Sequence, residues 1–208
     1  MKMNHEKLKY RQREVKYAGY IPTNQGHKPD PEKIEAISKM PRPEDTSAVR
    51  RFLGMANFLS KFMQRFSEIS EPLRQLTCTA IPWQCHHEHG NAADKIKAAI
   101  VEAPVLAYFS NGEPIRVQND ASQHGLGAVL LQNSKPIAYA SRAMTPTETN
   151  YAQIEREFLS VVFAMTKFDH YVYGRHVTIQ SDHQPLQTIL KKPIQQAPKR
   201  LQRRILQL

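Results

Sequence analysis

Hydrophobic residues recur at two different spacings along this chain, and the change falls near residue 105. Upstream they return every three or four positions between polar breaks, which predicts amphipathic helices. Downstream they alternate with polar residues or form short continuous runs, which predicts strands. The pattern therefore predicts a helical unit followed by a unit built around a sheet.

Helix-capping residues locate the predicted helices of the upstream half. Asp30 is expected to cap the first helix, with Pro31 at its first position, where a missing N–H costs nothing. Asp45 or Thr46 is expected to cap the second, whose apolar positions continue to Phe62. The four predicted helices cover residues 31–39, 46–62, 67–76 and 92–101.

The downstream half predicts the order β-β-β-α-β-α-α. Residues 122–125 and 132–135 have the turn chemistry of hairpins, so the first three strands are expected to be antiparallel neighbours. A long helix capped by Thr145 is expected over residues 147–171, before the fourth strand. The four predicted strands cover residues 115–118, 127–131, 136–140 and 176–180.

Charge is the most informative feature of the composition. The 208 residues contain 29 Lys and Arg against 19 Asp and Glu, a formal net charge of +10. Such an excess favours a polyanionic partner, either nucleic acid or an anionic membrane. Residues 191–208 hold six basic residues and no acid, although a solvated helix face with a loose terminus accounts for them equally well.

The remaining composition excludes several classes of protein. Two cysteines are too few for a disulfide framework and fit a reducing compartment. No apolar run approaches the ~18 residues of a membrane span. With 40% hydrophobic and 23% charged residues, wholesale disorder is excluded as well.

Three carboxylates lie at positions where α/β proteins commonly have catalytic residues. Asp120 lies where the chain leaves the first predicted strand and Asp182 lies where it leaves the fourth, and adjacent strand ends converge at one edge of a sheet. The third candidate is Glu155 or Glu157 on the long helix, and a helical wheel does not choose between them. Carboxylate oxygens suit Mg²⁺, and two such ions support phosphodiester hydrolysis. Turn-forming aspartates and a solvated glutamate are the commoner interpretation of these residues alone.

A series of motifs follows in order along almost the whole chain. The upstream motifs are residues 17–20 (YAGY), 28–33 (KPDPEK), 40–43 (MPRP) and 49–58 (VRRFLGMANF). The downstream motifs are residues 117–122 (VQNDAS), 125–132 (GLGAVLLQ), 136–142 (PIAYASR), 148–151 (ETNY), 155–159 (EREFL) and 181–186 (SDHQPL). Together they resemble the Pol polyproteins of gypsy-type LTR retrotransposons: the upstream half resembles the segment after the reverse-transcriptase palm, and the downstream half resembles the ribonuclease H domain.

The resemblance implies an α/β, ribonuclease H-like fold preceded by a helical thumb and connection segment. In that fold three antiparallel strands and a helix are followed by a fourth strand parallel to the first. The implied domains are the end of the reverse-transcriptase palm at 1–28, thumb and connection helices at 29–104, and a ribonuclease H-like domain at 105–208. We expect the last domain to be truncated before its final strand and before a fourth carboxylate of the family.

The implied activity is metal-dependent hydrolysis of the RNA strand of RNA–DNA hybrids. The family's catalytic and metal-binding acids correspond to Asp120, Glu157 and Asp182, which would share two Mg²⁺ or Mn²⁺ ions, with Asp120 bridging both. Because clustered carboxylates repel one another before metal binds, replacing Asp120 with Asn is expected to keep or raise stability. The alternative is a catalytically weak or inactive nucleic-acid-binding module from a decayed or co-opted element.

The expected partners are an RNA–DNA hybrid and the rest of the Pol polyprotein, with no membrane. We expect an intracellular location, in the cytoplasm or a virus-like particle, with the nucleus as a further compartment. Basic side chains would bind the hybrid backbone with little sequence preference. The expected nucleic-acid-binding residues are Lys191, Lys192, Lys199, Arg200, Arg203, Arg204 and His183.

Overall fold

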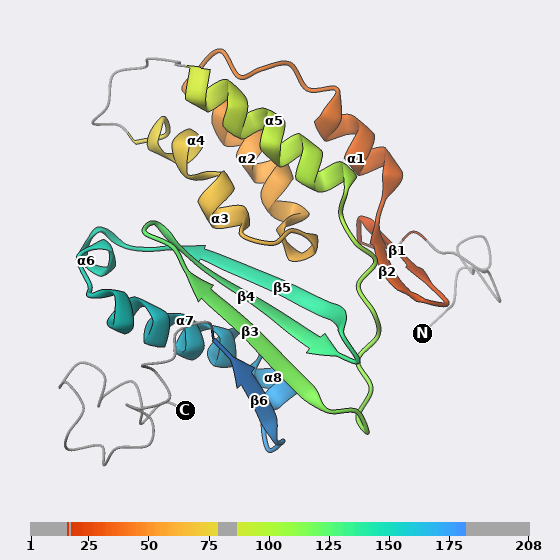
Figure 1. Ribbon diagram of the computed structural model, residues 1–208. Coiled ribbons are helices and arrows are strands. Elements are labelled where there is room, and N and C mark those ends of the chain that lie inside the picture. Colours follow the sequence, from red (N-terminus) through yellow and green to blue (C-terminus); the bar gives the residue numbers. More distant parts are fainter. Residues whose placement is uncertain (1–15, 17, 79–86, 182–208) are drawn as a thin grey trace, which may run out of the picture.

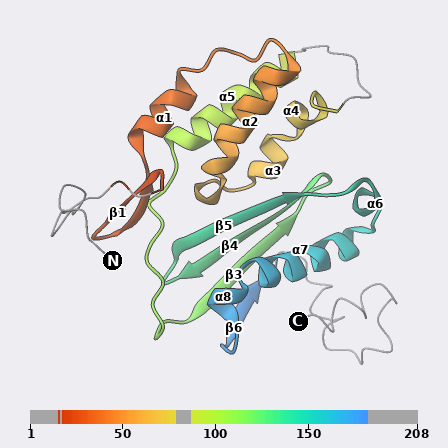
Figure 2. The same ribbon diagram turned by 180° about the vertical axis from the view of Figure 1, so that it is seen from behind.

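Three layers make up the part of the chain that the computed structural model describes, which is residue 16, residues 18–78 and residues 87–181. A group of helices lies on one side of a sheet and a single long helix lies on the other, as Figure 1 shows and Figure 2 confirms from behind. The elements before the sheet are β1 (Tyr20–Thr23), β2 (Gly26–Pro29), α1 (Pro31–Ser38), α2 (Thr46–Phe58), η2 (Ser60–Phe62), α3 (Phe66–Ile69), α4 (Glu71–Gln75) and α5 (His87–Val101). The later elements are β3 (Ile115–Ala121), β4 (Gly125–Gln132), β5 (Lys135–Ala143), α6 (Pro146–Thr149), α7 (Gln153–Lys167), α8 (Asp169–Val172) and β6 (Val177–Gln180).

The elements from α1 to α5 form a helical unit with a core of its own. The predicted caps are confirmed: the carboxylate of Asp30 accepts a hydrogen bond from the N–H of Glu32, and that of Asp45 accepts one from Ala48. Apolar side chains at helical spacing meet between α1, α2 and α5. The largest fully buried members of this core are Phe52, Phe62, Ile37, Leu59, Met63, Leu73, Ile96 and Ile100.

The sheet has the topology that the family resemblance implies. Its strand order is β5-β4-β3-β6, with β3, β4 and β5 antiparallel and β6 parallel to β3. Asn133 and Ser134 join β4 to β5 with positive φ angles of 50° and 60°, the backbone of a tight hairpin turn. The mixed α/β fold is therefore confirmed over the described residues.

The two faces of the sheet pack against different helices. Residues Ile115 and Val117 of β3 point to α7 and α8, where they pack with Phe168 in a second core. The opposite face carries the helical unit, anchored where the Ser67 N–H of α3 donates to the Ser141 Oγ of β5 at 3.1 Å. Alternate residues of one strand consequently face different environments.

Several local expectations differ from the structure. The helix expected over 46–62 ends at Phe58, where the separate turn η2 follows, and the helix expected from residue 92 begins at His87. The helix expected over 147–171 is divided into α6, α7 and α8, because the chain leaves helical geometry at Asn150–Ala152 and again at Phe168. The helix expected over 67–76 is divided at Ser70 into α3 and α4, and Pro72 lacks the N–H that would bond into a preceding turn. The β1–β2 hairpin lies in a stretch for which no strand is predicted.

Several predictions concern residues outside the described ranges. Asp182, His183 and the basic residues from Lys191 onward belong to this group, and so does most of the segment assigned to the palm. The three domain boundaries also remain predictions. In the described part of the chain, no helix combines the length and the apolar character that crossing a lipid bilayer requires.

Candidate active site

Asp120 occupies the next-to-last position of β3, the central strand between β4 and β6. Because side chains alternate along a strand, Asp120 shares a face with Gln118, whereas Asn119 points toward α7. The Asp120 side chain is 43% exposed, on the face that carries the helical unit. Across the β3–β4 pair its direct partner is Gly127, which has no side chain to cover the carboxylate.

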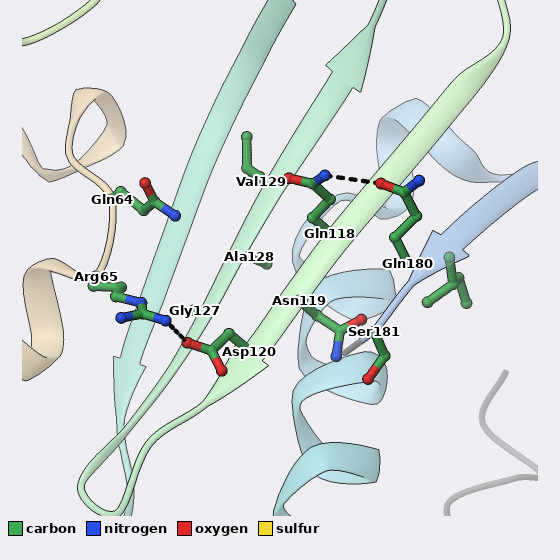
Figure 3. A pocket seen from close by; sticks show the side chains of 11 residues that line it. Gln64, Arg65, Gln118, Asn119, Asp120, Gly127, Ala128, Val129, Gln180 and Ser181 are labelled. Carbon is green, nitrogen blue, oxygen red and sulfur yellow. Dashed lines mark hydrogen bonds and ion pairs between the residues drawn. The ribbon is translucent and has the colours of Figure 1, made fainter. Parts of the chain in front are cut away.

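A polar cavity of about 540 Å³ opens over this end of the sheet. Figure 3 shows its lining, which comes from β3, β4, the end of β6 and the segment before α3. Gln118 of β3 donates to Gln180 of β6 at 2.8 Å across its floor. Parallel pairing sets Gln118 opposite Gln180, so Ser181 leaves β6 beside the last residues of β3 and lines the same cavity as Asp120.

Glu157 is brought to the same end of β3 by α7. The Asn119 amide donates to the Ser160 Oγ at 2.5 Å, and the Ser160 hydroxyl donates to the backbone carbonyl of Glu157 at 2.6 Å. All three residues are buried, and Glu157 is only 7% exposed. One carboxylate oxygen of Glu157 accepts from the Gln153 amide at 2.7 Å. This network fixes the position of α7 along β3. The contact is at Asn119, the residue next to Asp120.

Comparison with known proteins identifies this part of the chain. Residues 110–208 match the family described as the RNase H-like domain found in reverse transcriptase. The chain carries a reverse-transcriptase RNase H-like domain. It is 36% identical over 197 residues to the retrovirus-related Pol polyprotein from transposon 297 of Drosophila melanogaster, covering 93% of this chain and 18% of that protein. It is 34% identical over 199 residues to the Pol polyprotein from transposon gypsy of the same species, covering 89% of this chain and 19% of that protein.

The similarity to solved structures covers both the helical unit and the unit built around the sheet. A foamy viral protease-reverse transcriptase in complex with an RNA/DNA hybrid is 26% identical, with a TM-score of 0.77, over 95% of this chain and 27% of that one. A foamy viral protease-reverse transcriptase in complex with double-stranded DNA gives the same TM-score at 27% identity, over 95% of this chain and 42% of that one. The chain spans about a fifth of the length of the curated Pol relatives that it matches.

Glu155, the open alternative to Glu157, has a structural role in the RNase H-like domain. Its Oε2 accepts a hydrogen bond from the Ala152 N–H at 3.1 Å, which satisfies a backbone donor at the start of α7. Glu157 lies half a turn further on and is buried against the sheet side of the helix. The assignment of Glu157 as the catalytic residue remains a prediction, and this geometry favours it over Glu155.

Arg65 is a residue of this site that sequence analysis missed. It lies between η2 and α3, and its guanidinium forms an ion pair with the Asp120 carboxylate, drawn as a dashed line in Figure 3. The two residues are 55 positions apart in the sequence. Only the general excess of positive charge pointed to a basic neighbour, and no motif connects Arg65 to Asp120.

The oxygen donors at this end of β3 fit a divalent metal in their chemistry. Asp120 and Glu157 supply carboxylates, Ser181 supplies a hydroxyl, and the buried Asn119 Oδ1 has no hydrogen-bond partner among the described residues. Oxygen ligands of this kind are those that Mg²⁺ prefers. Within the described ranges, however, no three His, Cys, Asp or Glu side chains gather closely enough to hold an ion. The third predicted acid, Asp182, follows directly after the last described residue.

Proposed function

We propose that this chain is the ribonuclease H segment of a retrotransposon Pol protein and hydrolyses the RNA strand of RNA–DNA hybrids. The observation that supports this most is the grouping at one end of β3. Asp120 and Ser181 line one polar cavity there, and α7 brings the buried Glu157 to the same strand end. Converging strand ends with carboxylates are where α/β folds carry out chemistry.

In this proposal Asp120, Glu157 and Asp182 would hold the two Mg²⁺ or Mn²⁺ ions. Bound divalent ions supply an activated water and stabilise the leaving oxygen of a phosphodiester. The protein's own part is to hold its carboxylates in position: the Asn119–Ser160 hydrogen bond sets Glu157 relative to β3. Glutamine amides of the cavity floor offer neutral donors to a phosphate backbone.

We propose that basic side chains bind the substrate mainly through the phosphates of its backbone. The net charge of +10 supports this, since basic side chains release condensed counterions when they bind nucleic acid. The rest of the Pol polyprotein is the proposed protein partner, and the proposed location is intracellular, in the cytoplasm, a virus-like particle or the nucleus. The proposed contacts are Lys191, Lys192, Lys199, Arg200, Arg203, Arg204 and His183.

A cleavage assay tests the proposal. The chain is incubated with a hybrid whose RNA strand carries a fluorophore, in Mg²⁺ or Mn²⁺, and the products are separated on a denaturing gel. We expect metal-dependent cleavage that Asp120→Asn and Glu157→Gln each reduce at least a hundredfold. Glu155→Gln is the matched control: the amide oxygen still accepts from Ala152, so cleavage should stay within about twofold of the wild type. Equal losses in Glu155→Gln and Glu157→Gln would contradict the assignment.

The second candidate is a nucleic-acid-binding module with little or no activity. The ion pair that Arg65 forms with Asp120 favours it, because a guanidinium already neutralises the carboxylate that metal needs. Hybrid binding without cleavage in either metal would select this candidate over the nuclease. In both cases affinity should fall with salt. Neutralising Lys199 and Arg200 together should lower the salt slope by about 0.9 for each phosphate that the variant no longer binds.

A further inference from the structure

The Asp120 carboxylate lies at the boundary between the sheet and the helical unit. β3 and β4 set Asp120 directly opposite Gly127, so both positions open toward the segment before α3. A Cβ added at Gly127 would meet the Cγ of Arg65 at 3.7 Å. The bare backbone of β4 at Gly127 thus lies next to the Arg65 side chain. Figure 3 shows the Arg65 guanidinium and the Asp120 carboxylate meeting beside Gly127.

The backbone holds Arg65 in a special conformation at this point. Its φ of 54° and ψ of 30° are left-handed, which costs a residue other than glycine about 1 kcal/mol or more. Two positions later, Ser67 ties the segment to the sheet through the Ser141 hydroxyl of β5. Gly125 allows this approach, because a Cβ there would stand 2.8 Å from the Ser67 Oγ. Docking of the helical unit on β4 and β5 therefore places the Arg65 side chain at the edge of the cavity.

The ion pair is accessible to solvent and therefore exchangeable. The Arg65 side chain is 51% exposed and that of Asp120 is 43% exposed. Exposed ion pairs contribute little to stability, so another cation can displace the guanidinium at small cost. A divalent ion bound by several carboxylates meets this requirement.

We propose that Arg65 is the counter-ion of Asp120 in the metal-free protein and that divalent metal must displace it to bind. This inference rests on the proposed function, because it assumes that Asp120 is a metal ligand. Arg65 is then a positioning residue: it neutralises the carboxylate when the site is empty and weakens metal binding by competition. Since Arg65 belongs to the helical unit, metal occupancy at β3 is coupled to a side chain of the neighbouring unit.

Metal affinity measured directly tests the competition. Mn²⁺ is titrated into the full chain without nucleic acid, and binding is followed by electron paramagnetic resonance of the free ion. We expect Arg65→Gln to tighten the Mn²⁺ Kd about two- to fivefold, the range that an exposed ion pair contributes. Arg65→Lys keeps the charge and should stay near the wild type. Arg42→Gln is the matched control: Arg42 of the helical unit pairs with Asp94 at 2.7 Å, both exposed, and it does not line this cavity.

The variants separate failure of this inference from failure of the proposed function. If Asp120→Asn weakens Mn²⁺ binding and Arg65→Gln leaves the Kd unchanged or weaker, the competition is wrong and the metal site stands. If Asp120→Asn leaves the Kd unchanged, the metal site itself is wrong, and this inference fails with it. Thermal unfolding in EDTA adds a measurement that needs no metal. The Tm changes of Arg65→Gln and Asp120→Asn should be less than additive in the double variant, and full additivity would overturn the pairing.

Discussion

Glu148 connects the end of β5 to the first turn of α6, and replacing it with Gln is a sharp test of this structure. Both carboxylate oxygens accept from Arg142, at 2.8 and 3.1 Å. The same carboxylate accepts from the Thr145 N–H at 2.9 Å, while the Thr145 hydroxyl accepts from the Glu148 N–H in a capping box. Glu148→Gln keeps the shape of the side chain and removes its charge.

The magnitude follows from the pKa of Glu148. Hydrogen bonds from Arg142 lower that pKa from 4.5 to about 2, with a further contribution from Thr145 against the opposing effect of burial. At full strength a difference of this size corresponds to about 3 kcal/mol of folding free energy. The Arg142 side chain is 36% exposed, however, and solvent screens the interaction. We therefore expect Glu148→Gln to lower the free energy of unfolding by about 1–2 kcal/mol at pH 7.

The pH dependence has a definite sign. Because the folded-state pKa of Glu148 lies below its unfolded value, the contribution is complete above about pH 4.5 and is lost as pH falls toward about 2. Urea unfolding followed by circular dichroism at pH 7, 5 and 3 measures it in both proteins. The difference in unfolding free energy between wild type and Glu148→Gln should be constant from pH 7 to 5 and smaller at pH 3.

A matched control keeps the interpretation specific. Glu113 lies on an exposed loop before β3, and Glu113→Gln should change the unfolding free energy by less than about 0.5 kcal/mol. A Glu148→Gln effect that equals the Glu113→Gln effect, or that stays unchanged down to pH 3, would refute the argument from the Arg142 ion pair.

Three further perturbations have definite expected outcomes in urea unfolding. Ser160→Ala should cost about 1–3 kcal/mol, because the Asn119 amide then loses its partner inside the protein; a cost below about 0.5 kcal/mol would contradict the network. Gly125→Ala should destabilise, since the new Cβ would stand 2.8 Å from the Ser67 Oγ, whereas Gly54→Ala in α2 meets nothing within 4 Å and should stabilise by about 0.5–1 kcal/mol. Asp120→Asn in EDTA should lower stability by about 0.2–1 kcal/mol through loss of the Arg65 ion pair, and a gain would show that the pair is absent in solution.

The sequence predicts well those features that neighbouring residues decide. Asp30, Asp45 and Thr145 cap helices because their side chains reach backbone donors two or three residues away. Alternation along β3 and the turn at Asn133 and Ser134 likewise depend on local backbone chemistry. The parallel pairing of β6 with β3 is not local, and it was expected only because of the family resemblance.

Breaks within helices were missed because the apolar pattern continues through them. Tyr151 and Ile154 keep the spacing of the helix expected over 147–171, yet α6, which starts at the Thr145 capping box, ends at Thr149 after a single turn. Ala152 is then extended, with ψ at 152°, and a second start follows with Glu155 on its N–H. Hydrophobic periodicity does not indicate such a restart, because the restart depends on which backbone N–H groups find side-chain acceptors.

The surroundings of Asp120 were the least predictable part of the site, and they reverse one expectation. From the sequence, three carboxylates were expected to repel one another, so that Asp120→Asn would keep or raise stability. The structure instead places a guanidinium on Asp120, and removing the charge of Asp120 then removes an attraction. The position of Arg65 depends on how the helical unit docks, and no local pattern in the sequence encodes that docking.

Docking of the helical unit gives the two glycines of the GLGAVLLQ motif a role in the site. Gly125 and Gly127 are two residues apart on one strand, so both face the helical unit. Because Gly125 has no Cβ, Ser67 can approach the strand and anchor α3. Because Gly127 has no Cβ, the Arg65 side chain can lie next to the backbone of β4. Because α7 approaches the same strand end from the other face, the end of β3 has the helical unit on one side, at Asp120, and α7 on the other, at Asn119. If Asp120 and Glu157 bind metal as proposed, a change at Gly125 should alter Mn²⁺ affinity through Arg65, whereas Ser160→Ala should alter it through Glu157.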